Sequence, residues 1–248
     1  MERGAKEEII GKQDGDSQLS TTAFELKRLW QDGSDVCGVC LAVRRGVERR
    51  IDALFYENVN DVPARQAIRQ AGGFCRYHAG FILRQGDALG TAIILRDVLT
   101  AHLRSLEGGQ SRSAGSLLDL SRLVRSAPGA TWESEVARRP CTVCDAERDI
   151  TWTVIGAMLA ALENEEFAAL FSRAARLCLG HYHLAGDVAS DAQQVLLRAV
   201  EIRTLRQITD DLAELARKHD YRFADEPKGA EMRSWRTALN VASSGTEG

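Results

Sequence analysis

The chain has 248 residues, of which 44% are hydrophobic and 27% charged, a balance that predicts a soluble globular protein with a sizeable core. Its formal net charge of -3 excludes the global basic field of a nucleic-acid-binding protein, so nucleic acid is not an expected partner. No stretch has the length of uninterrupted apolar residues that a membrane span needs, and the charged N-terminal residues lack a signal-peptide core. We therefore expect a cytoplasmic protein with no membrane contact.

Helical patterns begin after a charged N-terminal tail, residues 1–20, which is expected to be disordered. Thr22-Ala-Phe-Glu25 has the form of a capping box that opens a short helix ending at Trp30. Further on, apolar residues recur every three or four positions, which predicts one buried stripe on a long helix. These residues are Cys40, Val43, Val47, Ile51, Leu54 and Phe55.

Two more helices complete the first half of the chain. Asn60 or Asp61 can cap the first of them, and Pro63 suits its first turn. Gly72-Gly73 favours its end, because glycine adopts a left-handed cap at little cost. A longer helix is predicted over residues 89–106. We assign residues 21–106 to a first helical repeat.

The second half shows the same succession after a linker. Residues 107–132 are richer in glycine and serine and are taken as this linker. Residues 133–222 form the second repeat, with an apolar stripe from Ile150 to Leu162 and a long helix over residues 191–218. Residues 223–248 are a C-terminal extension. No run alternates as a strand does, so the predicted fold class is all-α.

All six cysteines and two of the histidines follow one repeated pattern. Cys37-Gly-Val-Cys40 is followed, after 34 residues, by Cys75-Arg-Tyr-His78. Cys141-Thr-Val-Cys144 is followed, after 33 residues, by Cys178-Leu-Gly-His181. In a cytosolic chain, paired CxxC spacing favours metal or redox chemistry over disulfides. The nearly equal spacers predict a tandem repeat in which the second copy has lost one residue.

The pattern predicts two metal centres. A CxxC turn presents two thiolates to one ion, and a CxxH turn supplies the other two ligands of a tetrahedral site. We expect each repeat to be a helical hairpin whose returning helix brings its own two motifs together. The predicted ligands are Cys37, Cys40, Cys75 and His78 in the first repeat, and Cys141, Cys144, Cys178 and His181 in the second. His183, two residues further on, is an alternative to His181.

Three thiolates and one imidazole are typical of a closed structural zinc site, so two zinc ions per chain are the expected cofactors. All four positions are filled by protein, which leaves no place for a water nucleophile. The sequence also fixes no other nucleophile or substrate, and an enzyme is not favoured. Iron–sulfur clusters remain an alternative, as does a redox or sensor protein that releases zinc when its thiolates are oxidised.

Two features bear on partners. A polar cluster at the predicted tip of the first hairpin is either a capped turn or a recognition site for a ligand. It consists of Tyr56, Glu57, Asn60, Asp61 and Arg65. Residues 37–105 hold 10 Lys or Arg against 6 Asp or Glu, whereas residues 141–219 hold 8 against 12. Opposite charges favour docking of the copies within or between chains. We predict a helical scaffold or adaptor that binds a protein partner or self-associates.

The cysteine motifs and the stretch between them carry a family resemblance. The residues concerned are Cys37, Cys40, Tyr56, Glu57, Asn60, Asp61, Arg65, Gly73, Phe74, Cys75 and His78. The chain resembles an uncharacterised bacterial and archaeal family of unknown function, whose members show CPxC, YExxND and GFCxxH elements, usually followed by a second such half. Gly38 and Thr142 stand where that family has proline. The resemblance covers residues 30–220 and implies metal binding without supplying an activity.

Overall fold

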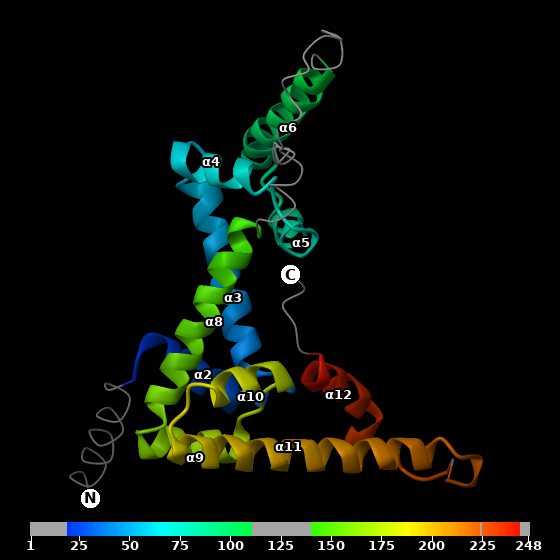
Figure 1. The fold of residues 1–248 in the computed structure, drawn as a ribbon. Coiled ribbons are helices and arrows are strands. Elements are labelled where there is room, and N and C mark those ends of the chain that lie inside the picture. The colour runs from blue at the N-terminus through cyan, green and yellow to red at the C-terminus, as the bar shows by residue number, and fades with distance from the viewer. Residues whose placement is uncertain (1–18, 111–139, 224, 244–248) are drawn as a thin grey trace, which may run out of the picture. The chain divides into compact units, whose positions relative to one another are not determined.

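The computed structural model describes residues 19–110, 140–223 and 225–243 (Figure 1). These residues form α-helices and short 3-10 turns, and none of them lies in a strand, which confirms the all-α prediction. The predicted N-terminal tail and the linker lie outside the described residues, except for residues 19–20 and 107–110.

The helices of the first half begin with α2 (Thr21–Gln31) and the long α3 (Gly38–Tyr56). Two short helices follow, α4 (Val62–Gln70) and α5 (Arg76–Gln85), and then the long α6 (Ala88–Gln110). The predicted helices are present, but the Thr22 capping box is wrong. Ser20 caps α2 instead, and its hydroxyl accepts a hydrogen bond from the backbone N–H of Ala23 at 3.2 Å.

The second half has the same succession of long, short, short and long helices. These are α8 (Thr142–Ala161), α9 (Glu165–Ala174), α10 (Leu179–Gly186) and α11 (Asp191–Lys218). The C-terminal part contains the 3-10 turns η2 (Tyr221–Phe223) and η3 (Ala230–Arg233), and the helix α12 (Ser234–Ala242).

The chain divides into two compact units whose boundaries fall inside α3 and α8. Among the described residues, unit 1 holds those up to Arg45 and those from Asp149 onward, and unit 2 holds those from Gly46 to Arg148. Each unit therefore contains segments from both halves of the sequence, which differs from the division into residues 21–106 and 133–222 that the repeat predicts.

The core of unit 1 is built on aromatic packing between α2 and α9. The ring centroid of Trp30 lies 5.4 Å from that of Phe167 and 5.4 Å from that of Phe171, both in tilted or edge-on geometry. Phe167 and Phe171 have no exposed surface, and Trp30 is only 4% exposed. The carbonyls at the end of α9 accept hydrogen bonds from the Arg203 guanidinium on α11. Aromatic packing thus holds α9 on α2, and the Arg203 hydrogen bonds hold its end on α11.

In unit 2 the helix α4 is less buried. Its N-cap is Asp61, whose carboxylate accepts a hydrogen bond from the Ala64 N–H at 2.8 Å, and its end is set by Gly72 and Gly73, both with positive φ. These boundaries confirm the predicted cap and stop. Of its nine residues only Ile68 is buried, however, and α4 packs on α6. The capping residues at its two ends therefore do much to determine where α4 begins and ends.

Replacement of Trp30 by alanine tests the aromatic core. Loss of a buried tryptophan from a packed core lowers the free energy of unfolding by about 3–5 kcal/mol. Urea denaturation followed by circular dichroism measures this change. Trp235→Ala is the matched control, because Trp235 on α12 is 47% exposed. Equal losses in the two variants would contradict the assignment of Trp30 to the core.

Candidate metal centres

Each of the four cysteine motifs lies at the N-terminus of a helix. Cys75 and Cys178 are the N-caps of α5 and α10, and Cys37 and Cys141 directly precede α3 and α8. In every motif the second ligand follows three residues later, in the first helical turn, so both side chains lie on one side of that turn. The free N–H groups and the helix dipole at these positions favour thiolates.

The first centre lies in unit 1 and joins the starts of α3 and α10. Its members are Cys37, Cys40, Cys178 and His181, whose ligand atoms all lie within 4.8 Å of one another. The His181 Nδ1 atom is 3.6 Å from the Cys37 sulfur and 3.2 Å from each of the other two sulfurs. The sulfurs of Cys40 and Cys178 are 3.7 Å apart. All four side chains therefore converge on one point.

The second centre lies in unit 2 and joins the starts of α5 and α8. Its members are Cys75, His78, Cys141 and Cys144, again within 4.8 Å of one another. The His78 Nδ1 atom is 3.2 Å from the Cys75 sulfur and 3.4 Å from each of the other two. The N–H groups of His78 and Cys144 point to the sulfurs of Cys75 and Cys141, at 3.5 and 3.4 Å. Such donors stabilise thiolate charge.

These groups contain all eight predicted ligands, but they correct how the ligands pair. Each centre takes its CxxC from one half of the sequence and its CxxH from the other, so the expected closure of a hairpin on its own two motifs is wrong. The physical reason is length. The 19 residues of α3 rise about 28 Å, whereas the nine residues of α4 return only about 14 Å, and Cys75 does not come back to Cys37.

The spacing of the donors fits a single tetrahedral ion. With zinc–sulfur bonds of 2.3 Å, two sulfurs on one tetrahedral ion lie about 3.8 Å apart, and a sulfur and a nitrogen slightly closer. The sulfur pairs Cys40–Cys178, Cys75–Cys144 and Cys141–Cys144 are 3.7, 3.6 and 3.4 Å apart. The donor sets are thus preformed at nearly the size that one such ion requires.

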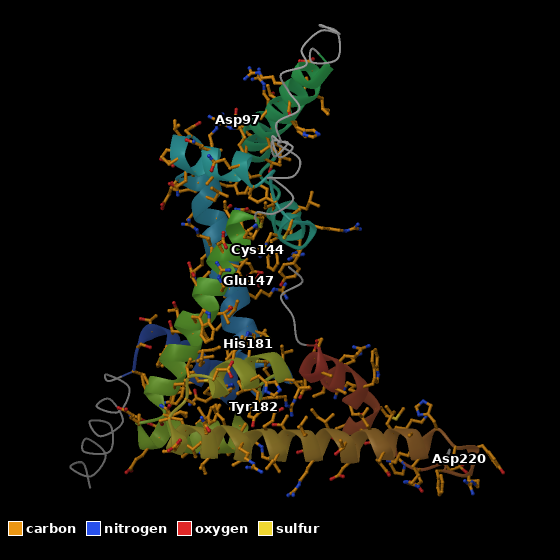
Figure 2. The ribbon with its side chains drawn as sticks, in the orientation of Figure 1. Asp97, Cys144, Glu147, His181, Tyr182 and Asp220 are labelled. Carbon is orange, nitrogen blue, oxygen red and sulfur yellow. The ribbon has the colours of Figure 1, made fainter. Side chains whose placement is uncertain are left out.

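His78 has a carboxylate partner that the sequence motifs did not indicate. Its Nε2 atom, on the ring edge away from the thiols, lies 3.2 Å from a carboxylate oxygen of Glu147, and both side chains are buried. Glu147 lies on α8, one turn after Cys144 (Figure 2). A carboxylate at this position orients a metal-binding imidazole and makes it a stronger ligand. Its sequence signal is an acidic residue three positions after the CxxC, but which histidine that residue meets depends on the crossed pairing.

The protein environment shifts the pKa values of the ligands in opposite directions. Burial lowers the pKa of His78, but the bonds to Cys141 and Glu147 raise it more, to about 10. Burial raises the pKa of Cys141, yet His78 and neighbouring backbone donors bring it down to about 6. Burial and the neighbouring thiols raise the pKa of Cys144 to about 12. One thiolate therefore opposes ionisation of the next, and a bound cation would remove this opposition.

The first centre shows the same competition among its thiols. Hydrogen bonds from neighbouring groups hold the pKa of Cys178 far below its usual range, while bonds to Cys178 and Cys37 raise that of Cys40. Glu201 on α11 is also affected, because burial and the negative charge of Cys178 raise its pKa to about 7. The oxygens of Glu201 are buried without a hydrogen-bond partner among the described residues. A cation at this centre would offset that concentration of negative charge.

His183 and the polar cluster lie outside both centres. His183 lines a hollow with Tyr182, Asp187 and Asp191, so His181 is the histidine of the first centre. The polar cluster does not converge on one site. Asp61 caps α4, Arg65 binds Asp97 on α6, and the Tyr56 side chain is 90% exposed. This arrangement fits the capped-turn interpretation.

Gly38 explains one departure from the family pattern. Its N–H donates a hydrogen bond to the Arg176 carbonyl at 3.2 Å, a bond that proline could not make. A Cβ atom at this position would also clash with the indole of Trp30. The glycine therefore allows the aromatic core of unit 1 to pack directly against the first CxxC turn.

The fold and the two donor sets define a helical protein with two Cys₃His groups able to bind metal ions. The chain belongs to a family of unknown function, DUF6062, whose model matches residues 23–246. It is also 26% identical, over 211 residues, to an uncharacterized 23.9 kDa protein in the xynA 3' region of Caldicellulosiruptor sp. (strain Rt8B.4), a match that covers 83% of this chain and 93% of that protein. No solved structure matches the chain. Among the described helices, none has the length and apolar character needed to cross a bilayer.

Metal stoichiometry of two double variants tests the crossed pairing. Cys37→Ser with Cys178→Ser removes two ligands from the first centre only, so one bound metal ion per chain should remain. Cys37→Ser with Cys75→Ser removes one ligand from each centre, and both ions should be lost or greatly weakened. Elemental analysis of the purified variants measures this. If each half closed its own centre, the two results would be exchanged.

Proposed function

We propose that the protein is a zinc-stabilised helical scaffold in which each Cys₃His group holds one structural zinc ion. The main support is the mutual distance of the donor atoms, which lies within 4.8 Å in both groups and near the edge length of a zinc tetrahedron. Three thiolates and one imidazole leave no ligand position for substrate or water. Zinc would then act by joining helix N-termini rather than by catalysis.

The same distances bear on the iron–sulfur alternative. The cysteines of a cluster with two or four irons bind different metal atoms, so their sulfurs spread wider than the ligands of a single ion. The compact groups here favour a mononuclear ion. Zinc-thiolate redox chemistry is the second candidate, and the partial exposure of Cys40, Cys75 and Cys144 supports it, because an oxidant can reach a partly exposed thiolate.

The crossed ligand sets suggest why the protein would need metal. Each zinc would tie the start of a long helix from one half to the start of a short helix from the other, and the repeated helix order and spacing support a tandem duplication. In the folded chain, neither half completes a metal site by itself, because each group takes its CxxC from one half and its CxxH from the other. Zinc binding and folding of the whole chain would therefore be coupled.

Elemental analysis and visible spectroscopy of anaerobically purified protein test this proposal. Two zinc ions per chain and no visible absorption are expected. Removal of zinc by a strong chelator should lower the thermal midpoint of unfolding by more than ten degrees or so, because both centres close loops and join helices. Absorption near 400 nm with bound iron, or metal-free native protein of unchanged stability, would contradict the zinc assignment.

We further propose that this scaffold associates with a second copy of itself through α6. Four leucines on α6 are 49–74% exposed: Leu89, Leu99, Leu103 and Leu106. Leu99, Leu103 and Leu106 follow one another at four- and three-residue steps, the spacing with which two helices interdigitate in a coiled coil. One helix face offered by identical chains is self-complementary about a twofold axis.

Light scattering after size exclusion tests self-association. A mass near twice the 27.3 kDa of one chain is expected for the native protein. Leu99→Glu with Leu103→Glu should give the monomer, because two charges would be buried in the seam. Leu83→Glu is the matched control, since Leu83 on α5 is 79% exposed but lies off this face. A monomeric native protein, or equal dissociation in the control, would contradict the proposal.

A further inference from the structure

Unit 2 contains a groove between α4 and α6 with an unusual concentration of arginines. The groove has a volume of about 840 Å³, and Arg65 and Arg69 line it from α4 while Arg96 and Arg104 line it from α6. Its one carboxylate is Asp97, on α6 (Figure 2). The side chains that face the groove thus carry three more positive than negative charges, in a chain whose net charge is -3.

Asp97 orients one wall of the groove without neutralising the rest. It lies 3.0 Å from Arg65 Nε and 2.7 Å from Arg65 Nη2, while the nearest Arg69 nitrogen is 3.8 Å away. Within the part of the chain that the structure describes, Arg96 and Arg104 have no ion pair, and both are exposed. Like charges confined to one groove repel one another unless an anion lies between them.

The corresponding helices α9 and α11 carry no arginine at these four positions. The N-cap Asn164 lies 103 residues after the N-cap Asp61, and Cys178 lies 103 residues after Cys75. This common offset aligns the two helix pairs. At this offset the four arginines correspond to uncharged residues and Asp97 corresponds to a buried valine. These residues are Ala168, Ser172, Ala199, Gln207 and Val200.

The packing of the two helix pairs differs accordingly. In α9 the residues Phe167, Leu170 and Phe171 are buried, whereas in α4 only Ile68 is. The helix α9 is therefore held by its aromatic packing on α2 and by the hydrogen bonds that Arg203 of α11 donates to its last carbonyls, whereas α4 and α6 leave an open, charged groove. The four groove arginines have no counterpart in this second helix pair, which points to a ligand for the charged groove.

We infer that the groove between α4 and α6 binds a small organic molecule that carries two or more phosphate groups. The guanidinium group is planar and donates paired hydrogen bonds that match phosphate oxygens. Three excess positive charges suit a multiply charged anion better than a single carboxylate. Ile93 and Thr100 also line the groove, so an apolar surface and a hydroxyl are available to the organic part. This site is separate from both metal centres and does not depend on their zinc.

Isothermal titration of the full-length, metal-loaded protein tests the site, with inorganic pyrophosphate and ATP as probes. Both should bind with a dissociation constant well below millimolar, and ATP should bind more tightly because of its organic part. Arg96→Ala and Arg104→Ala should each weaken binding roughly tenfold, since each removes charge-assisted hydrogen bonds. These two arginines are chosen because they are exposed and unpaired among the described residues, so their replacement should leave the fold intact.

Arg206→Ala is the matched control, because Arg206 is an exposed arginine on α11, in unit 1. It should leave the dissociation constants of both probes unchanged. An equal loss in Arg206→Ala would show general charge attraction and overturn the site. Failure of both probes to bind, or equal affinity for orthophosphate, would overturn it too. Tighter binding of a single-stranded oligonucleotide than of ATP would assign the groove to nucleic acid instead.

Discussion

The convergence of four potential metal ligands from two helix N-termini is the constraint on which the rest of this structure depends. Two helix starts, each with a positive dipole end, meet at each group together with three sulfurs and an imidazole. The dipole ends favour thiolates, but the thiolates oppose one another, as the diverging pKa values of Cys141 and Cys144 show. A single cation would resolve this conflict, so the arrangement is suited to binding a metal ion.

The identity of the ligands was predictable from sequence because it is a local property. A cysteine at the helix cap and a second ligand three residues later lie on one turn, whatever the rest of the chain does. Their pairing was not predictable in the same way, because it depends on the lengths of α3 and α4, and the motif alone does not specify those. Glu147 was missed for a related reason, since its role depends on the crossed approach of α5 to α8, which places His78 beside it.

The two halves of the sequence share one order of helices but differ in what those helices bury. The aromatic core of unit 1 and the open groove of unit 2 show this difference. Trp30 packs on Phe167 and Phe171, and Gly38 leaves room for its indole beside the first centre. At the positions of those phenylalanines α4 has Ala64 and Ile68, so its apolar surface is small. Cap and stop residues predicted α4, and the repeated succession of elements implied α9. What each helix buries depends on tertiary neighbours that periodicity does not specify.

A nine-residue helix with one buried side chain has little intrinsic stability, because short helices in water are marginal. The capping carboxylate of Asp61 begins α4, and Gly72 and Gly73 end it. Two residues later Cys75 enters the second centre, so the metal would anchor the end of α4 in place of an apolar face. Because α4 would not depend on apolar burial for its position, its surface can carry arginines. Where burial must hold the helix, as in α9, the same positions carry alanine and serine, and the buried face carries phenylalanine and leucine.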